Sequence, residues 1–268
     1  MEYSEIIKSS YFHDNTGMLL KEDCLEVMKD FSDNSVDMIL CDLPYGKTIQ
    51  SWDKIINIEL LWEQYDRIRK DKCPIALFGS EPFSSLLRVS NITNFKYDWI
   101  WHKSKPSGMA LARKQPMRNH EIISIFYKNN YYPIKEPREG FTEKSKARFK
   151  SEKNLGTYRN HGDGISGLGS TDLKKIDKLR FPTTIKRFGS LKNRLGKNFH
   201  PTQKPTELLE YLIKTYTKEY DIILDNAAGS CSTAIACKNT NRKWICIEQE
   251  LEYCDVSVER IKEYEKTK

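Results

Sequence analysis

Short apolar runs alternate with helical stretches in the first and last parts of the 268-residue chain, and this alternation constrains the fold most strongly. Seven runs are typical of buried strands, at residues 18–20, 36–41, 74–78, 97–101, 121–127, 222–224 and 244–247. Five stretches have helical periodicity, at residues 24–31, 60–68, 206–216, 232–239 and 252–266. Because apolar strands that alternate with helices form parallel sheets covered on both faces, we predict an α/β protein with a mostly parallel sheet.

Composition excludes several other classes of protein. With 38% hydrophobic residues the chain can form a core, and no apolar run approaches the length of a membrane span. The N-terminal residues lack the basic and apolar regions of a signal peptide. The seven cysteines and five histidines have no metal-ligand spacing. We therefore expect reduced thiols, a cytoplasmic location, no bound metal and no membrane partner.

Positive charge is concentrated in the middle of the chain. Residues 102–204 contain 24 basic and 8 acidic residues, a net charge of +16, whereas the rest of the chain carries −9. Residues 129–198 also interrupt the alternation of strands and helices, which predicts a basic inserted region between two halves of one domain, 1–128 and 199–268. A basic surface of this size suits a polyanion, nucleic acid first, although a solvated insertion would have the same composition.

The segment Asp42-Leu43-Pro44-Tyr45 directly follows a predicted strand. Ligands of open α/β sheets bind beyond the carboxyl ends of the strands. At this position the Asp42 carboxylate and the Leu43 carbonyl can accept the two N–H bonds of a planar amino group, and Tyr45 can stack on its ring. Such acceptors stabilise charge that develops on an attacking nitrogen. The alternative is an ordinary turn that closes a strand.

A second acidic residue, Asp225, ends the strand at 222–224, and a small-residue loop leads from it into a helix at Ser232. Small side chains let a ligand approach the backbone, and the helix N-terminus offers N–H groups. Glu248 ends the next strand, where an acid can hold ribose hydroxyls. The loop has neither the dinucleotide nor the phosphate-loop glycine pattern, so neither NAD nor ATP is favoured. An ordinary tight turn with a charged edge is the alternative.

These motifs resemble the amino-group DNA methyltransferases that use S-adenosylmethionine, in the permuted motif order called the beta group. The matching segments, in chain order, are Asp42–Tyr45, the basic region, Gln203–Pro205, Asp225–Ser230 and Glu248. The resemblance implies a Rossmann-like class I methyltransferase fold with seven strands. Residues 1–128 would then be the catalytic half, 129–198 the inserted target-recognition region and 199–268 the cofactor-binding half.

The resemblance also implies individual roles. Four catalytic residues would hold a flipped base: Asp42, Leu43, Pro44 and Tyr45. Nine residues would contact S-adenosylmethionine: Asp23, Cys24, Cys41, Lys204, Asp225, Ala227, Gly229, Ser230 and Glu248. A helix cap accounts for Asp23 nearly as well. From the charge of the basic middle region, five residues are expected to contact DNA: Arg113, Lys114, Arg118, Arg148 and Arg187.

Three residues depart from the pattern of the family. Leu43 replaces a proline of the catalytic motif, but its carbonyl is retained. Ala227 and Cys231 replace an aromatic residue and a glycine of the cofactor loop, changes that could weaken cofactor binding. A catalytically silent DNA-binding member of the fold therefore remains an alternative to an enzyme.

The reaction implied by the resemblance is methyl transfer from S-adenosylmethionine to N6 of an adenine flipped out of duplex DNA. Adenine is favoured because the motif begins with Asp, whereas many cytosine-N4 members begin with Ser. Cytosine N4, RNA and protein glutamine are the alternative substrates. Double-stranded DNA is the expected partner, and homodimers are common in the family. Nothing in the chain resembles a nuclease centre, so a cognate restriction endonuclease would be a separate protein.

Overall fold

The computed structural model describes residues 3–46, 55–127, 130–137, 179–189 and 203–266. The chain divides into two compact units. The larger comprises Met1–Tyr132 with Thr184–Lys268, and the smaller comprises Pro133–Thr183. In the described part of the smaller unit, β7 (Glu136–Pro137) pairs antiparallel with β8 (Leu179–Arg180).

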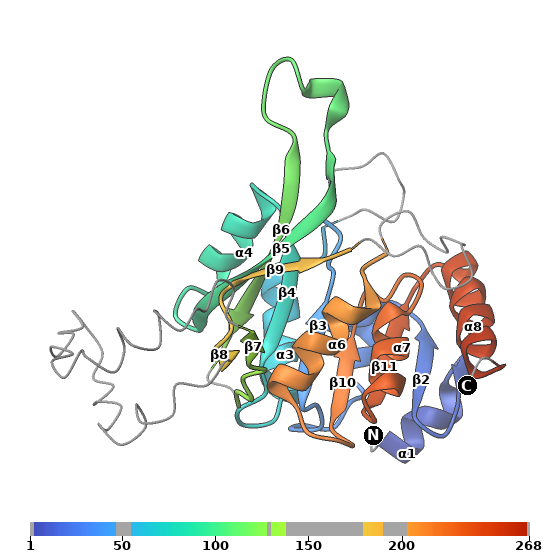
Figure 1. The fold of residues 1–268 in the computed structure, drawn as a ribbon. Coiled ribbons are helices and arrows are strands. Elements are labelled where there is room, and N and C mark those ends of the chain that lie inside the picture. Colours follow the sequence, from blue (N-terminus) through green and yellow to red (C-terminus); the bar gives the residue numbers. More distant parts are fainter. Residues whose placement is uncertain (1–2, 47–54, 128–129, 138–178, 190–202, 267–268) are drawn as a thin grey trace, which may run out of the picture. The chain divides into compact units, whose positions relative to one another are not determined.

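The larger unit is built on a nine-stranded sheet with the order β1-β2-β11-β10-β3-β4-β6-β5-β9 (Figure 1). The strands are β1 (Phe12–His13), β2 (Gly17–Lys21), β3 (Met38–Cys41), β4 (Ile75–Gly79), β5 (Phe95–Ser107), β6 (Arg118–Phe126), β9 (Ile185–Phe188), β10 (Ile222–Asp225) and β11 (Lys243–Glu248). The run from β2 through β11, β10 and β3 to β4 is parallel throughout. β6 pairs antiparallel with both β4 and β5, so the sheet is mixed but mostly parallel.

Helices cover both faces of the sheet because successive strand residues point to opposite sides. Met38 and Leu40 of β3 belong to the core cluster formed with α6 (Thr206–Tyr216), α7 (Ser232–Asn239) and α8 (Leu251–Lys266). Ile39 and Cys41 belong to the cluster formed with α2 (Cys24–Met28), α3 (Ile58–Ile68) and α4 (Phe83–Ser90). Short helices α1 (Tyr3–Ile6) and η1 (Ile7–Ser9) precede β1. This arrangement confirms the predicted Rossmann-like α/β fold.

The strands and helices predicted from apolar patterning are all present, and the sheet has two strands beyond the expected seven. β1 folds back on β2 through a turn in which Asp14 accepts hydrogen bonds from the backbone of Thr16 and Gly17. β9 pairs with β5 and lies within 129–198, the range predicted for the insertion. α4 was also not predicted, because its buried face consists only of Phe83, Ser84 and Leu87.

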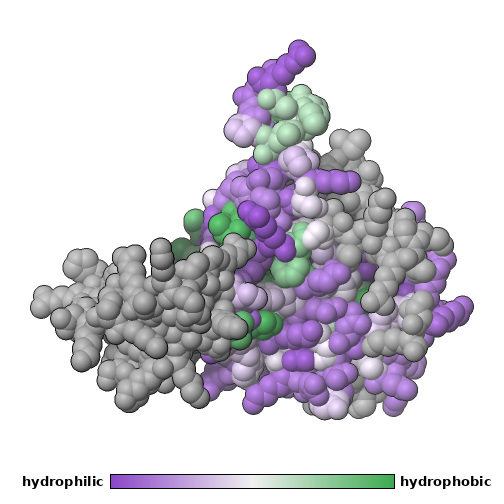
Figure 2. Space-filling view, viewed as in Figure 1, coloured by the Kyte–Doolittle hydropathy of each residue, from purple (hydrophilic) through white to green (hydrophobic). Residues whose placement is uncertain are grey.

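β5 and β6 form a hairpin that is much longer than the apolar runs predicted. It extends past the rest of the sheet, and its tip contains a 3-10 helix, η2 (Met109–Leu111) (Figure 1). Apolar and hydrophilic residues are mixed on the surface of this tip (Figure 2), where Met109 is 74% exposed. The polar outer half of the hairpin has no buried face, which is why periodicity did not reveal it.

Parallel pairing brings the carboxyl ends of β2, β11, β10, β3 and β4 to one edge of the sheet. Asp23, Glu248, Asp225 and Asp42 lie at or just beyond four of these ends. β6 runs in the opposite direction, and Ile122 pairs with Gly79, so the beginning of β6 lies at the same edge. In the residues described, no helix is long and apolar enough to cross a membrane.

Gly17 is required where β2 approaches β11. It pairs with Trp244, and a Cβ atom there would meet the indole and the carbonyl oxygen of Trp244 well inside contact distance. We expect Gly17→Ala to lower the free energy of unfolding by about 1–3 kcal/mol, as other overpacked sites do, in a urea titration. Gly189→Ala is the control, because no described atom lies within 4 Å of a Cβ there. Equal stabilities of the two variants would contradict this packing.

Candidate active site

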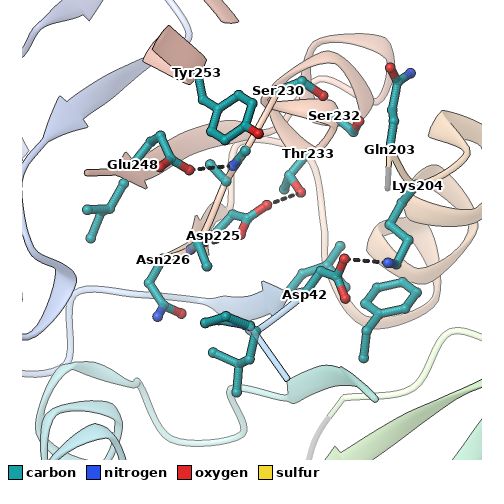
Figure 3. Close-up of a pocket in the computed structure, with 18 of the residues that line it drawn as sticks. Asp42, Gln203, Lys204, Asp225, Asn226, Ser230, Ser232, Thr233, Glu248 and Tyr253 are labelled. Atoms are coloured by element: carbon teal, nitrogen blue, oxygen red, sulfur yellow. Dashed lines mark hydrogen bonds and ion pairs between the residues drawn. The ribbon is translucent and has the colours of Figure 1, made fainter. Parts of the chain in front are cut away.

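A cavity of about 510 Å³ lies at the carboxyl edge of the larger unit. Its walls come from the loops after β2, β3, β10 and β11, from β5 and β6, and from the segment before α6. Figure 3 shows Asp42 and Lys204 together, with Glu248 and Asn226 farther along the cavity. Segments far apart in the sequence therefore share one cavity.

The loop after β3 positions the predicted catalytic motif. Asp42, Leu43, Pro44 and Tyr45 all line the cavity. The Tyr45 hydroxyl donates a hydrogen bond of 2.5 Å to Asp42 Oδ1, and the Tyr45 ring packs 5.1 Å from that of Phe83 at the start of α4. The carboxylate and the ring are thus held in place before any ligand binds.

Asp42 also belongs to a four-charge cluster, which we define as Asp42, Lys103, Glu121 and Lys204. Lys204 donates a hydrogen bond to Asp42 Oδ2, and its Nζ lies 3.3 Å from Glu121 Oε2. Lys103 Nζ in turn lies 3.1 Å from Glu121 Oε1. The Lys204 ammonium is also 5.3 Å from the centre of the Phe78 ring. The cluster contains two positive and two negative side chains.

Burial and pairing act against each other in this cluster. Burial alone would lower the pKa of Lys204, but the carboxylates of Asp42 and Glu121 outweigh it and raise that pKa. Burial would also raise the pKa of Glu121, but Lys204 and Lys103 hold that pKa below its ordinary value. The pKa of Asp42 is raised by burial, which Lys204 only partly offsets and Glu121 reinforces. Lys204 and Glu121 are therefore firmly charged.

The loop after β10 presents Asp225 to the cavity. Thr233 at the start of α7 donates a hydrogen bond of 2.5 Å to Asp225 Oδ2 (Figure 3), and burial raises the pKa of Asp225 to about 6. Gly229 and Cys231 both have a φ of +51°. Cys231 occupies the position of the glycine usual in the family and adopts the left-handed conformation that glycine favours, so the backbone of the loop does not depend on glycine there.

Glu248 at the end of β11 also holds the loop that follows β10. Its carboxylate accepts hydrogen bonds from the backbone N–H groups of Gly229, at 2.8 Å, and Glu250, at 3.0 Å, and burial raises its pKa. From α8, Arg260 donates to the Ser230 carbonyl at 2.7 Å, and the Ser257 hydroxyl donates to the Gly229 carbonyl at 2.8 Å. Arg260 and Ser257 thus anchor the loop to α8.

The remaining predicted cofactor residues are distributed along the same cavity, with one exception. Asp23, Cys24 and Ala227 line it, and Asp23 also caps α2 by accepting a 2.8 Å hydrogen bond from the N–H of Leu25. Cys41 does not line the cavity and is buried in the core on the face of α2–α4. Lys204 lines the cavity beside Asp42, as part of the four-charge cluster.

The predicted DNA-contact residues fall in three places. Arg113 and Lys114 are exposed near the tip of the β5–β6 hairpin. Arg118 begins β6 and donates a hydrogen bond to Ser80, and exposed Arg187 on β9 pairs with His102 of β5. Arg148 lies outside the described residues.

Three residues that lie near the motifs in space but far from them in the sequence were not identified from the sequence. Glu121 and Lys103 lie within strands, and Arg260 lies within the closing helix, so none has a local motif. One signal was present, because Glu121 begins an otherwise apolar run at the edge where the motifs meet. An acid at that point of a buried strand needs a partner.

The charges of the cavity define the kind of ligand it suits. Six acidic residues line it: Glu22, Asp23, Asp42, Glu121, Asp225 and Glu248. Among the described lining residues, the only basic ones are Lys103 and Lys204, and both lie against Glu121. The half around Asp225 and Glu248 therefore suits a cationic ligand with hydroxyl groups and disfavours phosphates.

Comparison with known proteins agrees with this geometry. A family model described as DNA methylase, of the N6/N4 methyltransferase type, matches residues 36–259. The Type II methyltransferase M2.MboI of Moraxella bovis is 30% identical over 265 residues, covering 90% of this chain and 85% of that protein. The Type II methyltransferase M.HinfI of Haemophilus influenzae is 26% identical, covering 94% and 70%.

Two solved structures illustrate the similarity of fold. M1.HpyAVI in complex with SAM has a TM-score of 0.61 and 23% identity, covering 91% of this chain and 98% of that one. The cytosine-N4-specific PvuII DNA methyltransferase has a TM-score of 0.63 and 13% identity, covering 96% and 93%. Since the family model spans most of the chain, the protein belongs to the family of N6/N4 amino-group DNA methyltransferases.

Proposed function

We propose that this protein transfers a methyl group from S-adenosylmethionine to N6 of an adenine in duplex DNA. One observation carries the proposal: the Asp42–Tyr45 loop and the Asp225–Glu248 region line the same cavity. The acceptor and the donor of a methyl group could therefore bind side by side. Aligned binding of two reactants supplies much of the rate of a displacement reaction.

The acidic half of the cavity suits the cofactor. S-adenosylmethionine supplies an activated methyl group on a cationic sulfonium. Asp225 would face the positive charge of its methionine portion, Gly229 and Ser230 would line that portion, and Glu248 would accept hydrogen bonds from the ribose. Asp23 and Cys24 would lie at the adenine end. The similar protein M1.HpyAVI was crystallised with SAM.

The Asp42 half suits an amino group. Asp42 and the Leu43 carbonyl would accept the two N–H bonds of the target nitrogen, and Tyr45 would stack on the base. Positive charge develops on the nitrogen as it is methylated, and these acceptors would stabilise it. Adenine is favoured over cytosine because the motif begins with Asp, whereas many cytosine-N4 members begin with Ser.

The purified protein should transfer labelled methyl groups to unmethylated genomic DNA, and nucleoside analysis of the product should yield N6-methyladenine. Asp42→Ala should reduce transfer by about a hundredfold or more, the scale seen when a charge-stabilising group is removed. Its affinity for the cofactor, measured by calorimetry, should stay within about threefold, because Asp42 lies in the other half of the cavity. N4-methylcytosine in the product would refute the choice of base, and wild-type transfer rates in Asp42→Ala would refute the role of Asp42.

Cofactor affinity should depend on the protonation of Asp225. With a pKa of about 6, this carboxyl is ionised above that pH and loses its charge as pH falls through it. We expect cofactor affinity in calorimetry to be flat above about pH 7 and to fall by up to about tenfold per pH unit below 6. Asp225→Asn should bind more weakly and lose most of this dependence, leaving only the contribution of Glu248. An unchanged pH dependence in Asp225→Asn would contradict the assignment.

Duplex DNA would contact the basic part of the protein. The β5–β6 hairpin suits this contact electrostatically, since residues 102–120 contain several basic residues and no acidic residue. Arg113, Lys114, Arg118 and Arg187 are the proposed contacts in the described structure, and Arg148 is proposed from the sequence alone. Such contacts give affinity through phosphate and leave the choice of sequence to other groups.

The contribution of the β5–β6 hairpin to DNA binding can be measured with a variant that combines Arg113→Ala and Lys114→Ala. DNA affinity should fall by about tenfold at low salt, and the slope of log K against log salt should decrease by about 2, one for each lost phosphate contact. Lys218→Ala is the matched control, because exposed Lys218 follows α6 at the other end of the parallel strands. Equal salt slopes for the wild type and the double variant would remove the hairpin from the DNA interface.

A further inference from the structure

The four-charge cluster poses a difficulty for the proposed reaction. Both oxygens of Asp42 are engaged, Oδ1 by the Tyr45 hydroxyl and Oδ2 by the Lys204 ammonium. An amino group that donates to Asp42 shares the carboxylate with that ammonium, whose positive charge makes the carboxylate a weaker acceptor. Lys204 is also a positive charge next to a nitrogen that becomes positive during methylation, and two like charges in a buried site repel strongly.

Glu121 offers the ammonium another position. Its Oε2 is buried, lies 3.3 Å from Lys204 Nζ and accepts no hydrogen bond in the described part of the chain. Its other oxygen, Oε1, accepts a hydrogen bond from Lys103. Lys204 therefore forms an ion pair with Oε2 that lacks the alignment of a hydrogen bond, so Oε2 remains a strong acceptor for the ammonium. Because Nζ already lies 3.3 Å from Oε2, the exchange of Asp42 for Glu121 requires only a short movement of the ammonium.

We propose that Glu121 is a positioning residue that takes over the Lys204 ammonium from Asp42 when the target base occupies the cavity. This inference rests on the proposed function. With Lys204 on Glu121, Asp42 Oδ2 becomes available to the amino group. The positive charge of Lys204 is then neutralised by a carboxylate other than the one that faces the reacting nitrogen. Lys103 keeps Glu121 ionised and fixed on its far side.

The test is a double-mutant cycle in single-turnover methylation of unmethylated genomic DNA. In Glu121→Gln the amide holds Lys204 poorly, so Lys204 should stay on Asp42 and the rate should fall by about tenfold or more. In a Lys204→Met background, where no ammonium competes, the same Glu121→Gln change should alter the rate by less than about twofold. An equal loss in both backgrounds would overturn the proposal.

Three further variants and measurements separate positioning from a loss of structure. Glu121→Asp keeps the charge and should retain more activity than Glu121→Gln. Glu81→Gln removes an exposed carboxylate that pairs with Arg88 at 2.7 Å outside the cavity, and it should have no effect. Cofactor affinity measured by calorimetry should stay within about twofold in Glu121→Gln, because Glu121 lies in the Asp42 half. A loss of cofactor affinity that matches the loss of rate would show a general collapse of the cavity instead.

The dependence of the methylation rate on pH gives a second measurement, in which the acid limb and the plateau should change in different ways. The charged and titratable groups around Asp42 are Lys204 before α6, Glu121 on β6, Tyr45 on its own loop, Cys41 at the end of β3 and Asp225 after β10. Glu121 raises the pKa of Asp42, so Glu121→Gln should shift the acid limb of the rate profile to lower pH while the plateau falls. An unshifted acid limb would count against the cluster as described.

Failure of this inference is distinguishable from failure of the proposed function. If the wild-type protein transfers no methyl group to DNA, the proposed function fails. If the wild type is active and the cycle is additive, only the role of Glu121 fails. Once the methylated position is mapped, a duplex with adenine at that position should bind Glu121→Gln more weakly than the wild type in the absence of cofactor, whereas a duplex with unsubstituted purine there, which has no amino group, should bind both proteins equally. Equal affinities of the two proteins for the adenine duplex would show that Lys204 does not compete with the amino group.

Discussion

The parallel pairing of β2, β11, β10 and β3 is the constraint on which the rest of the structure depends. Parallel strands end together, so the acidic residue at each end is delivered to one edge whatever the distance between the strands in the sequence. Asp42 and Asp225 are 183 positions apart and meet only because β3 and β10 are neighbours. A single cavity lined by the Asp42–Tyr45 loop and by the loops after β10 and β11 follows from this register.

Carboxylates gathered at one edge of the sheet repel one another, and the two halves of the cavity reduce this repulsion in different ways. Around Asp225 and Glu248 the negative charge is balanced by hydrogen bonds from Thr233 and from backbone N–H groups, so this half retains an attraction for cations. Around Asp42 it is balanced by two lysines. The half around Asp225 and Glu248 therefore keeps a negative charge that suits a positive ligand, whereas the four charges around Asp42 already neutralise one another.

Most strands and helices, and the sequence motifs that line the cavity, could be predicted because they depend on local sequence patterns. Apolar runs gave the strands of the parallel region, and an acid followed by Pro or Gly marked where the strands end. Glu121 and Arg260 could not be predicted. Each acts through partners more than 25 residues away, Lys204 and the Ser230 loop, and its position follows from pairing and helix packing that no local pattern encodes. Cys41 faces the core because alternation along β3 turns it away from the cavity.

The position of β10 in the sheet also determines which strand edges are exposed while the chain is being synthesised. β10 lies between β3 and β11, near the centre of the sheet, yet among the described strands of this sheet only β11 follows it along the chain. Until residues 222–248 emerge, β3 has an unpaired edge and β2 pairs only with the two-residue strand β1. Exposed edges of this kind template association with other chains. A nascent chain that ends before residue 222 would hold the Asp42–Tyr45 loop on an open half-sheet whose strand edges can associate with other chains.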